Sequence, residues 1–284
     1  MSKKQKSTTT NTTPTTRELV VLDKQTAKQA SKSIKALQNH NSQHSTHELV
    51  YLILNTKTPT AKEKEFVPRI LPLPKRLAKL NDLQILLVTK DPVDTYKTPL
   101  VAKGACTEDI FQDIISYKRF RKQVSNAKEA TKLYHEYDLI VIDHRLHPLL
   151  PKILSKTIFV KTNKKYPLMI QMARPTADAQ LTKSKRSNKL KDERVEPEYV
   201  LKQLKSICKG TTFVASKGTC LNVVVGYTDY HPVELLHNVD AVLDYLVNEK
   251  YRPVGGVVKG GFEGIVDVHV KTSESISLPI LEKK

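Results

Sequence analysis

YDLIVIDHRLHPLLPKIL, residues 137–154, joins an unbroken apolar run to Asp143, His144 and Arg145, and then to a helical pattern. A second short apolar run, LQILLVTKD, lies at residues 83–91, and helical patterns separate the two, among them TEDIFQDII at residues 107–115. Strands that are apolar on both faces and alternate with helices are typical of a parallel sheet covered on both sides. Residues 81–160 are therefore predicted to form a small α/β unit.

The segments on either side of this unit have a different pattern. Asp23 is placed to cap a helix in which apolar residues recur at spacings of three and four, while the lysines between them face water. GIVDVHV, residues 264–270, alternates apolar and polar residues, as a strand with one buried face does. Residues 17–80 and 161–284 are predicted to be α+β. Residues 1–16 have little to bury and are predicted to be a disordered tail.

The net charge of +18 predicts a polyanionic partner. Lys and Arg outnumber Asp and Glu by 15 to 5 in residues 1–80, by 12 to 10 in residues 81–160, and by 20 to 14 in residues 161–284. The middle unit is thus nearly neutral. If the two flanking segments fold together, the middle unit is an insertion in one basic domain. The charge alone leaves RNA, DNA and an anionic membrane surface open. No apolar stretch reaches the length of a membrane span, and we expect no membrane partner.

Asp143, His144 and Arg145 follow a predicted parallel strand, where ligands of open α/β sheets bind. That position favours an enzyme, but no glycine-rich phosphate motif follows either strand, and the whole chain has only nine glycines. We therefore interpret the three residues as structural. Asp143 would cap the helix that begins near His147, and Arg145 would pair with Asp143. The sequence predicts no catalytic residue and no cofactor.

His40, His44 and His47 have a spacing that a metal site can use. No cysteine or other evident ligand lies nearby, so we interpret the stretch as a polar connector between a helix and a strand. No metal is expected.

A basic run lies at residues 182–194, in a stretch that is predicted to be a polar loop. It either binds phosphates or is a solvated surface, and no known RNA-binding module accompanies it. The run comprises Lys183, Lys185, Arg186, Lys189, Lys191 and Arg194.

Several blocks, in this order, resemble the large-subunit ribosomal protein L-one family: LNDLQILLVTKDP, YDLIVIDHRLHPLLPKIL, LKQLKSICKGTTFVASKGTCLNVVVG, HPVELLHNVDAVLDYLV, and RPVGGVVKGG leading to VHVKTSESISLPI. They are most similar to its nucleolar branch, the ribosome-biogenesis factors of the Utp-thirty type in the small-subunit processome. The resemblance implies a two-domain fold of α/β and α+β type. A discontinuous α+β domain, residues 17–80 plus 161–284, would carry an inserted Rossmann-like parallel α/β domain, residues 81–160.

Ribosomal members of the family grip rRNA through a Thr-Met-Gly loop after their last strand, and the corresponding positions here are Ser273, Glu274 and Ser275. Glycine permits close approach of the backbone to RNA, whereas Glu274 places a carboxylate against phosphates. The aromatic residue that precedes the first strand in ribosomal members is not evident near residues 44–46. The RNA-binding residues expected in this loop are Lys271, Thr272, Ser273 and Ser275.

The resemblance implies a non-enzymatic, monomeric factor that binds pre-rRNA in the nucleolus, within the small-subunit processome. Its other partners would be assembly factors and ribosomal proteins of the pre-ribosome, with no small-molecule substrate. Two alternatives stay open: a protein-binding scaffold of a large-subunit precursor, and a nucleotide-using enzyme built on the inserted sheet.

Overall fold

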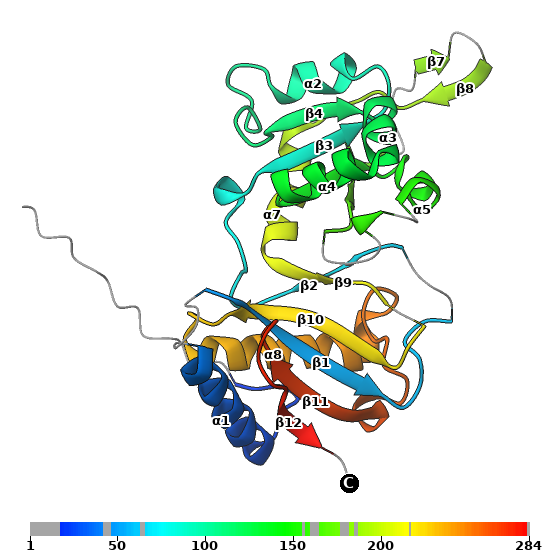
Figure 1. Ribbon diagram of the computed structural model, residues 1–284. Coiled ribbons are helices and arrows are strands. Elements are labelled where there is room, and N and C mark those ends of the chain that lie inside the picture. Colours follow the sequence, from blue (N-terminus) through cyan, green and yellow to red (C-terminus); the bar gives the residue numbers. More distant parts are fainter. Residues whose placement is uncertain are drawn as a thin grey trace, which may run out of the picture.

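The computed structural model contains two four-stranded sheets, one above the other in Figure 1, each with its own hydrophobic core. For Asn41 and for residues 182–184 and 187–191 only the backbone is described. The predicted disordered tail, residues 1–16, lies outside the described residues. The structure describes residues 18–41, 47–62, 66–154, 157–159, 165–176, 182–184, 187–215 and 217–282.

The outer sheet is antiparallel and takes strands from both ends of the chain. Its order is β10-β1-β11-β12. In the central strand, Leu52 pairs with Val223 on one side and with Val270 on the other. Residues far apart in the sequence therefore share one sheet. The strands are β1 (Leu49–Thr56), β10 (Cys220–Tyr227), β11 (Ile265–Lys271) and β12 (Leu278–Glu282).

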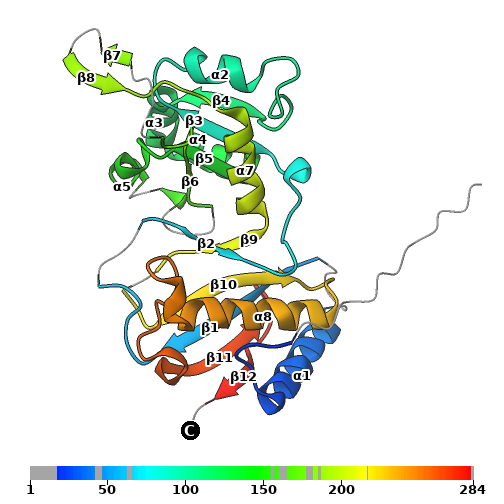
Figure 2. The same ribbon diagram turned by 180° about the vertical axis from the view of Figure 1, so that it is seen from behind.

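Two helices, α1 (Lys24–Asn41) and α8 (Pro232–Val247), cover one face of the outer sheet (Figure 2). The predicted cap of α1 is confirmed, since the Thr26 N–H donates to Asp23 Oδ1 over 3.0 Å. Pro232 occupies the first turn of α8, where its missing N–H costs nothing. Among the described helices, none is long and apolar enough to cross a membrane.

The inserted sheet is parallel, in the order β4-β3-β5-β6, as predicted. Leu86 and Val88 of β3 pack into one core, and Ile85 and Leu87 pack into another on the opposite face. This two-sided burial is the reason for the unbroken apolar runs. The strands are β3 (Ile85–Thr89), β4 (Asp113–Ser116), β5 (Leu139–Asp143) and β6 (Leu168–Ile170). The helices are α2 (Asp94–Leu100), α3 (Tyr117–Ser125), α4 (Ala127–Glu136), α5 (Leu150–Leu154) and α7 (Pro197–Cys208).

The chain passes between the two sheets at a short antiparallel ladder. There β2 (Arg69–Pro72) pairs with β9 (Gly210–Phe213). Gly210 is required at this point, because a Cβ there would lie 2.4 Å from the Leu71 carbonyl oxygen. Short 3₁₀ turns occur at Leu80–Asp82, His147–Leu149, Glu249–Tyr251 and Gly261–Gly264.

The second boundary of the inserted unit differs from the predicted residue 160. β6 pairs with β5, and Val200 and Leu204 of α7 pack in the same core as Ile85 and Leu87. The unit therefore extends to about Cys208. β6 has only three residues, and the apolar stripe of α7 does not indicate which sheet it covers.

Moving this boundary changes the distribution of charge. Residues 83–208 hold 24 Lys and Arg against 14 Asp and Glu, so the complete inserted unit is basic rather than neutral. Residues 1–82 hold 15 Lys and Arg against 6 Asp and Glu, whereas residues 209–284 hold 8 Lys and Arg against 9 Asp and Glu. The positive charge of the outer unit thus comes entirely from its N-terminal part.

Two further local predictions are wrong. The basic stretch at residues 182–194 is not all loop: β7 (Thr182–Ser184) and β8 (Ser187–Lys191) form a hairpin at the far end of the inserted unit (Figure 1). The helical pattern at residues 107–115 instead forms a turn that leads into β4. In both cases strand pairing outweighs a short local pattern.

Candidate nucleic-acid interface

The loop between β11 and β12 carries three of the residues predicted to contact RNA, and the fourth, Lys271, ends β11. Thr272 is fully buried and Ser275 is nearly so. The Thr272 N–H donates to Ser275 Oγ over 2.9 Å, and the Ser275 N–H donates to Thr272 Oγ1 over 3.3 Å. The Ser275 hydroxyl donates to the Ile276 carbonyl oxygen over 3.0 Å. These bonds fix the turn, because the two side chains satisfy its backbone groups.

This geometry corrects the role expected of Thr272 and Ser275. A hydroxyl that binds phosphate must reach the surface, whereas these two are buried and bonded within the loop. We assign both as positioning residues. Ser273 is exposed and Lys271, at the end of β11, is partly exposed, so these two keep the access that contact with RNA requires.

The tip of the loop adds an acidic and an apolar side chain. Glu274 is exposed, and Ile276 is 71% exposed. Residues 271–277 thus contain one lysine and one glutamate, so the loop has no net charge of its own. Because the attraction of RNA depends on positive charge, this loop alone is a weak phosphate site.

The sheet face that α1 and α8 leave uncovered turns toward the inserted unit. Tyr51 and Val224 of the outer sheet and Leu139 and Tyr166 of the inserted unit line a cleft of about 540 Å³. Lys165 also lines it, but its Nζ already donates to two backbone carbonyl oxygens, each over 3.0 Å. Burial raises the pKa of the Tyr166 hydroxyl, so the group stays neutral. The walls are therefore mainly apolar and aromatic, which does not suit phosphate.

The β7–β8 hairpin carries the second group of predicted RNA-binding residues. Lys183 lies in β7, and Lys189 and Lys191 lie in β8; their backbones pair in an antiparallel ladder, with Thr182 opposite Lys191. Lys185 and Arg186 lie outside the described residues. Three of the predicted cations thus lie on the backbone of one projecting element, far from the β11–β12 loop (Figure 1).

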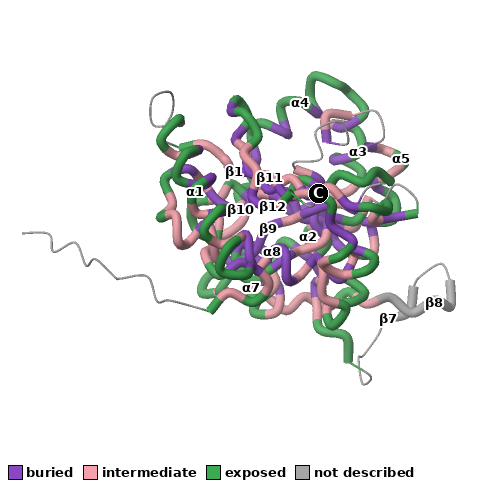
Figure 3. Tube along the Cα trace, turned by 90° about the horizontal axis from the view of Figure 1, so that it is seen from below, coloured by how far each residue is buried: buried purple, intermediate pink, exposed green. Residues whose placement is uncertain are grey.

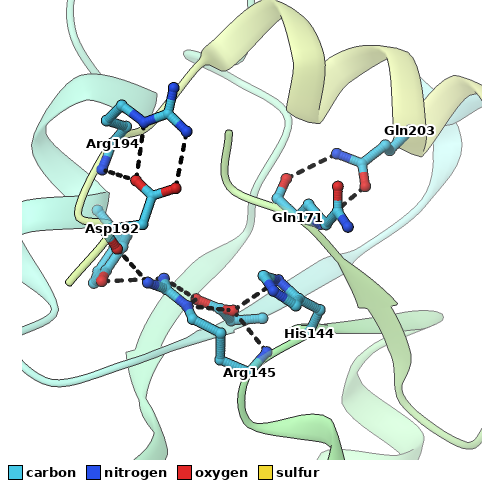
Figure 4. Close-up of polar contacts among 8 residues, drawn as sticks. His144, Arg145, Gln171, Asp192, Arg194 and Gln203 are labelled. Carbon is cyan, nitrogen blue, oxygen red and sulfur yellow. Dashed lines mark hydrogen bonds and ion pairs between the residues drawn. The ribbon is translucent and has the colours of Figure 1, made fainter. Parts of the chain in front are cut away.

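Asp143 ends β5 and is fully buried. Its carboxylate accepts hydrogen bonds from the Arg145 backbone N–H over 3.0 Å and from Arg145 Nε over 2.9 Å, and Arg145 Nη2 completes a bidentate pair (Figure 4). The predicted pairing is confirmed. The predicted cap is wrong, because no side chain caps the turn that begins at His147. Burial opposes the charge on Arg145, but the hydrogen bonds and charge of Asp143 raise its pKa above the ordinary value.

Arg145 also reaches the base of the β7–β8 hairpin. It donates to the Asp192 carbonyl oxygen and, over 3.1 Å, to the Tyr96 hydroxyl. Arg194 forms a bidentate pair with the Asp192 carboxylate and donates to the Arg174 carbonyl oxygen over 3.1 Å. The segments that enter and leave the hairpin are thus tied together by Arg194. The leaving segment is also tied to the end of β5 through Arg145 (Figure 4). The sequence does not indicate this link, because Asp192 lies 47 residues from Arg145.

This arrangement favours a structural role over acid–base chemistry. Both oxygens of Asp143 are bonded to Arg145 and the side chain is fully buried, so the carboxylate is not presented to a substrate. His144 is half exposed, with Nδ1 3.4 Å from Asp143 Oδ1. Asp192 is similar: hydrogen bonding from the Arg194 side chain lowers its pKa.

In the described part of the chain, no group of three or more His, Cys, Asp or Glu side chains is arranged to hold an ion. His47 instead stacks on Tyr227, with ring centroids 4.3 Å apart, and lies 3.2 Å from Asp229. His44 and the neighbouring residues 45 and 46, where an aromatic was sought, lie outside the described residues.

Comparison with known proteins gives the family. The model of the ribosomal protein L1p/L10e family matches residues 9–276. The chain belongs to this family. Its fold is accordingly the L1-family fold, with mixed α and β elements and a parallel sheet, and the resemblance inferred from the sequence blocks is confirmed.

Two relatives of this L1-family chain are named for ribosome biogenesis. Ribosome biogenesis protein UTP30 of Saccharomyces cerevisiae is 39% identical over 258 residues, which cover 89% of each chain. A Schizosaccharomyces pombe protein named for the same process, C306.07c, is 25% identical over 267 residues, which cover 93% of this chain and 82% of the relative. The similarity therefore includes both sheets of the structure.

Proposed function

We propose that this L1-family chain is a non-enzymatic ribosome-biogenesis factor that binds pre-rRNA in the nucleolus, within the small-subunit processome (90S). Family membership and the name of the UTP30 relative support the process. The observation that carries RNA binding is the charge distribution: the excess of +18 collects in residues 1–82 and in the inserted unit that bears the β7–β8 hairpin. A surface of this kind attracts phosphates whatever their sequence.

The two sheets form two domains in this proposal. Residues 18–82 and 209–282 make a discontinuous α+β domain that faces RNA, and residues 83–208 make an inserted Rossmann-like domain. Separate hydrophobic cores and a crossing through only two paired strands, β2 and β9, support this division. The inserted domain serves as a scaffold that carries the basic hairpin.

RNA contacts are assigned to two places. In the β11–β12 loop, Lys271 and Ser273 meet phosphates, while Thr272 and Ser275 hold the turn. In the basic run of residues 182–194, Lys183, Lys185, Arg186, Lys189 and Lys191 neutralise phosphates. Most of these residues are lysines, which act as mobile point charges and do not read bases by a planar fork. Binding is therefore directed by shape and sensitive to salt.

Crosslinking the tagged protein to RNA in cells, followed by sequencing of the adducts, tests the proposal. Adducts concentrated in the small-subunit part of pre-rRNA are expected. Adducts confined to large-subunit precursors would contradict the assignment of the particle. Co-purification with assembly factors and ribosomal proteins without any RNA adduct would instead make the chain a protein-binding scaffold.

Binding of nucleotides by the purified protein tests the non-enzymatic assignment. Titration with ATP and GTP is expected to give no saturable binding, because neither apolar strand of the inserted sheet is followed by a glycine-rich phosphate motif. Saturable binding that is lost when Asp143 or His144 is replaced would favour an enzyme. The same preparation, analysed by light scattering, is expected to be monomeric.

A further inference from the structure

Four lysines of α1 form a row along one side of the helix. Lys24, Lys28, Lys32 and Lys35 follow one another at spacings of four, four and three residues. At 3.6 residues per turn, this spacing places all four within an arc of about 80° and over a length of about 16 Å. All four are exposed. We call them the lysine row.

The opposite side of α1 is the side that packs on the protein. Ala30, Ile34 and Leu37 are buried in the outer core. The lysine row therefore points away from the molecule, and α1 lies at its outer edge with exposed residues along it (Figure 3).

The carboxylate that precedes the row, Asp23, caps the helix by accepting from the Thr26 N–H. Helix α1 contains no Asp or Glu, and across the described residues no ion pair or hydrogen bond of the four lysine side chains is present. Like charges four residues apart disfavour a helix. Repulsion within the row thus lowers the stability of α1 in the free protein, and an anionic partner would relieve this repulsion.

The composition of the row favours RNA phosphates over an acidic protein. Protein–protein interfaces are enriched in aromatic residues and arginine and depleted in lysine. Around the row, the exposed neighbours are Gln25, Ala36 and Asn39, which offer no large apolar anchor. Phosphate contacts that position an RNA backbone need only charge and reach, which lysine supplies.

The row also supplies what the β11–β12 loop lacks. Residues 209–284, which include that loop, have one more acidic than basic residue, so the outer unit draws its positive charge from residues 1–82. The Ser33 hydroxyl donates to the Pro279 carbonyl oxygen over 2.6 Å, which fixes α1 against β12. The row and the loop therefore lie on elements that pack directly against each other.

We infer that the lysine row of α1 binds the phosphate backbone of RNA, as a contact surface separate from the β11–β12 loop and the hairpin. The inference rests on the proposed function. Binding here is independent of base sequence, because no group in the row reads base edges.

The test compares two variants of the full chain that lose the same charge. In the first, the four lysines of the row are replaced by Gln, a good helix former. In the control, Lys118, Lys122, Lys128 and Lys132, which are exposed on α3 and α4 with the same four-residue spacing, are replaced by Gln. The probe is an RNA hairpin with a long duplex stem, titrated over a series of salt concentrations.

The slope of log affinity against log salt should become shallower by about three in the row variant, since each neutralised phosphate contributes about 0.7 to 0.9. The control should change it by less than one. A third variant with Arg at the four row positions should keep the slope. Circular dichroism should be unchanged in all three, and none of the three should unfold at a lower temperature than the wild type.

Equal slopes in the row variant and the wild type would overturn the inference, including the case in which the row binds an acidic protein. An equal reduction of the salt slope in the row variant and in the control would also overturn the inference, because the effect would then come from net charge alone. Failure of the proposed function looks different: the wild type itself would show no salt-dependent binding to RNA.

Discussion

The buried Asp143 carboxylate has the Arg145 guanidinium as its cationic partner, and this pair is isolated from water on the carboxylate side. Removing one member of such a pair leaves a charge without compensation in the interior, which costs more than the pair contributes when intact. The same guanidinium joins the Asp192 carbonyl oxygen and Tyr96. Both stability and the position of the hairpin therefore depend on Arg145.

Replacing Arg145 with Met is expected to lower the free energy of unfolding by about 3 kcal/mol, because Asp143 stays buried without its cation. Chemical denaturation measures this. His144→Gln is the control: this neighbouring side chain is half exposed and should change stability by less than about 0.5 kcal/mol. Similar effects of both substitutions would contradict the structural role assigned to the pair.

His147 gives a prediction about pH. The side chain is buried and its Nε2 has no described partner; burial lowers its pKa below the ordinary 6.5, although a backbone hydrogen bond with Pro167 opposes this. A lowered pKa means that the unfolded chain binds the proton first. The neutral ring therefore supports folding fully above about pH 6.5, and this support is lost as the pH falls below that value.

The free energy of unfolding should accordingly decrease between about pH 7 and about pH 5, and His147→Leu should reduce this dependence. Denaturant titrations at several pH values measure it. A His147→Leu protein with the wild-type pH dependence would show that His147 is not the group that titrates.

Among the individual elements, the β11–β12 loop is a fixed turn with a positive charge, Lys271, at its start and a negative charge, Glu274, at its tip. Thr272 and Ser275 hold it from within, so substitutions at the exposed tip change charge without changing shape. Lys271 lies across from Tyr51 at the end of β11, and Glu274 lies at the tip. The contribution of each charge to RNA binding can thus be measured separately.

Glu274→Gln is expected to tighten binding of RNA, because a carboxylate near phosphates is removed, and Lys271→Gln is expected to weaken it. Each change should alter the salt slope by about one, in opposite directions. Titration of both variants with the same RNA hairpin checks this. If neither affinity nor slope changes in either variant, the loop does not face RNA, and the hairpin with the lysine row carries the binding.

At the scale of the whole molecule, residues from the N-terminal and C-terminal parts of the chain pack in one hydrophobic core. Asp240 of α8, which is nearly fully buried, accepts hydrogen bonds from the backbone N–H groups of Val20, Val21 and Leu22, about 220 residues away. The sequence provides no local sign of this anchor. These hydrogen bonds fix the segment before α1 to α8, and both belong to the outer unit.

Replacing residues 83–208 with a short Gly-Ser linker should therefore leave a folded outer unit that still binds RNA. Replacing only residues 81–160 should fail, because β6 and α7 would remain without the sheet on which they pack. Circular dichroism, thermal unfolding and solubility of the two products distinguish them. A soluble, cooperative product from the shorter replacement alone would restore the boundary at residue 160.

Local patterns in the amino-acid sequence were enough for much of the architecture. The apolar run of β5, the stripe of α8, the cap at Asp23 and the alternation in β11 each depend on neighbours within a few residues, so periodicity and capping chemistry predict them. The order of the sequence blocks likewise led to the correct family.

The division between the two units, the role of Asp143 and the burial of Thr272 depended on contacts that are distant along the chain or that a turn creates. The amphipathic pattern of α7 is the same whichever sheet the helix covers. The structural role of Asp143 depends on its pair with Arg145, which also bonds to Asp192 at the base of the hairpin. Such pairings are set by the packing of whole sheets. The local secondary-structure propensities of the residues do not predict these pairings. The free energy that selects the pairings comes from surfaces that are buried only when the chain is folded.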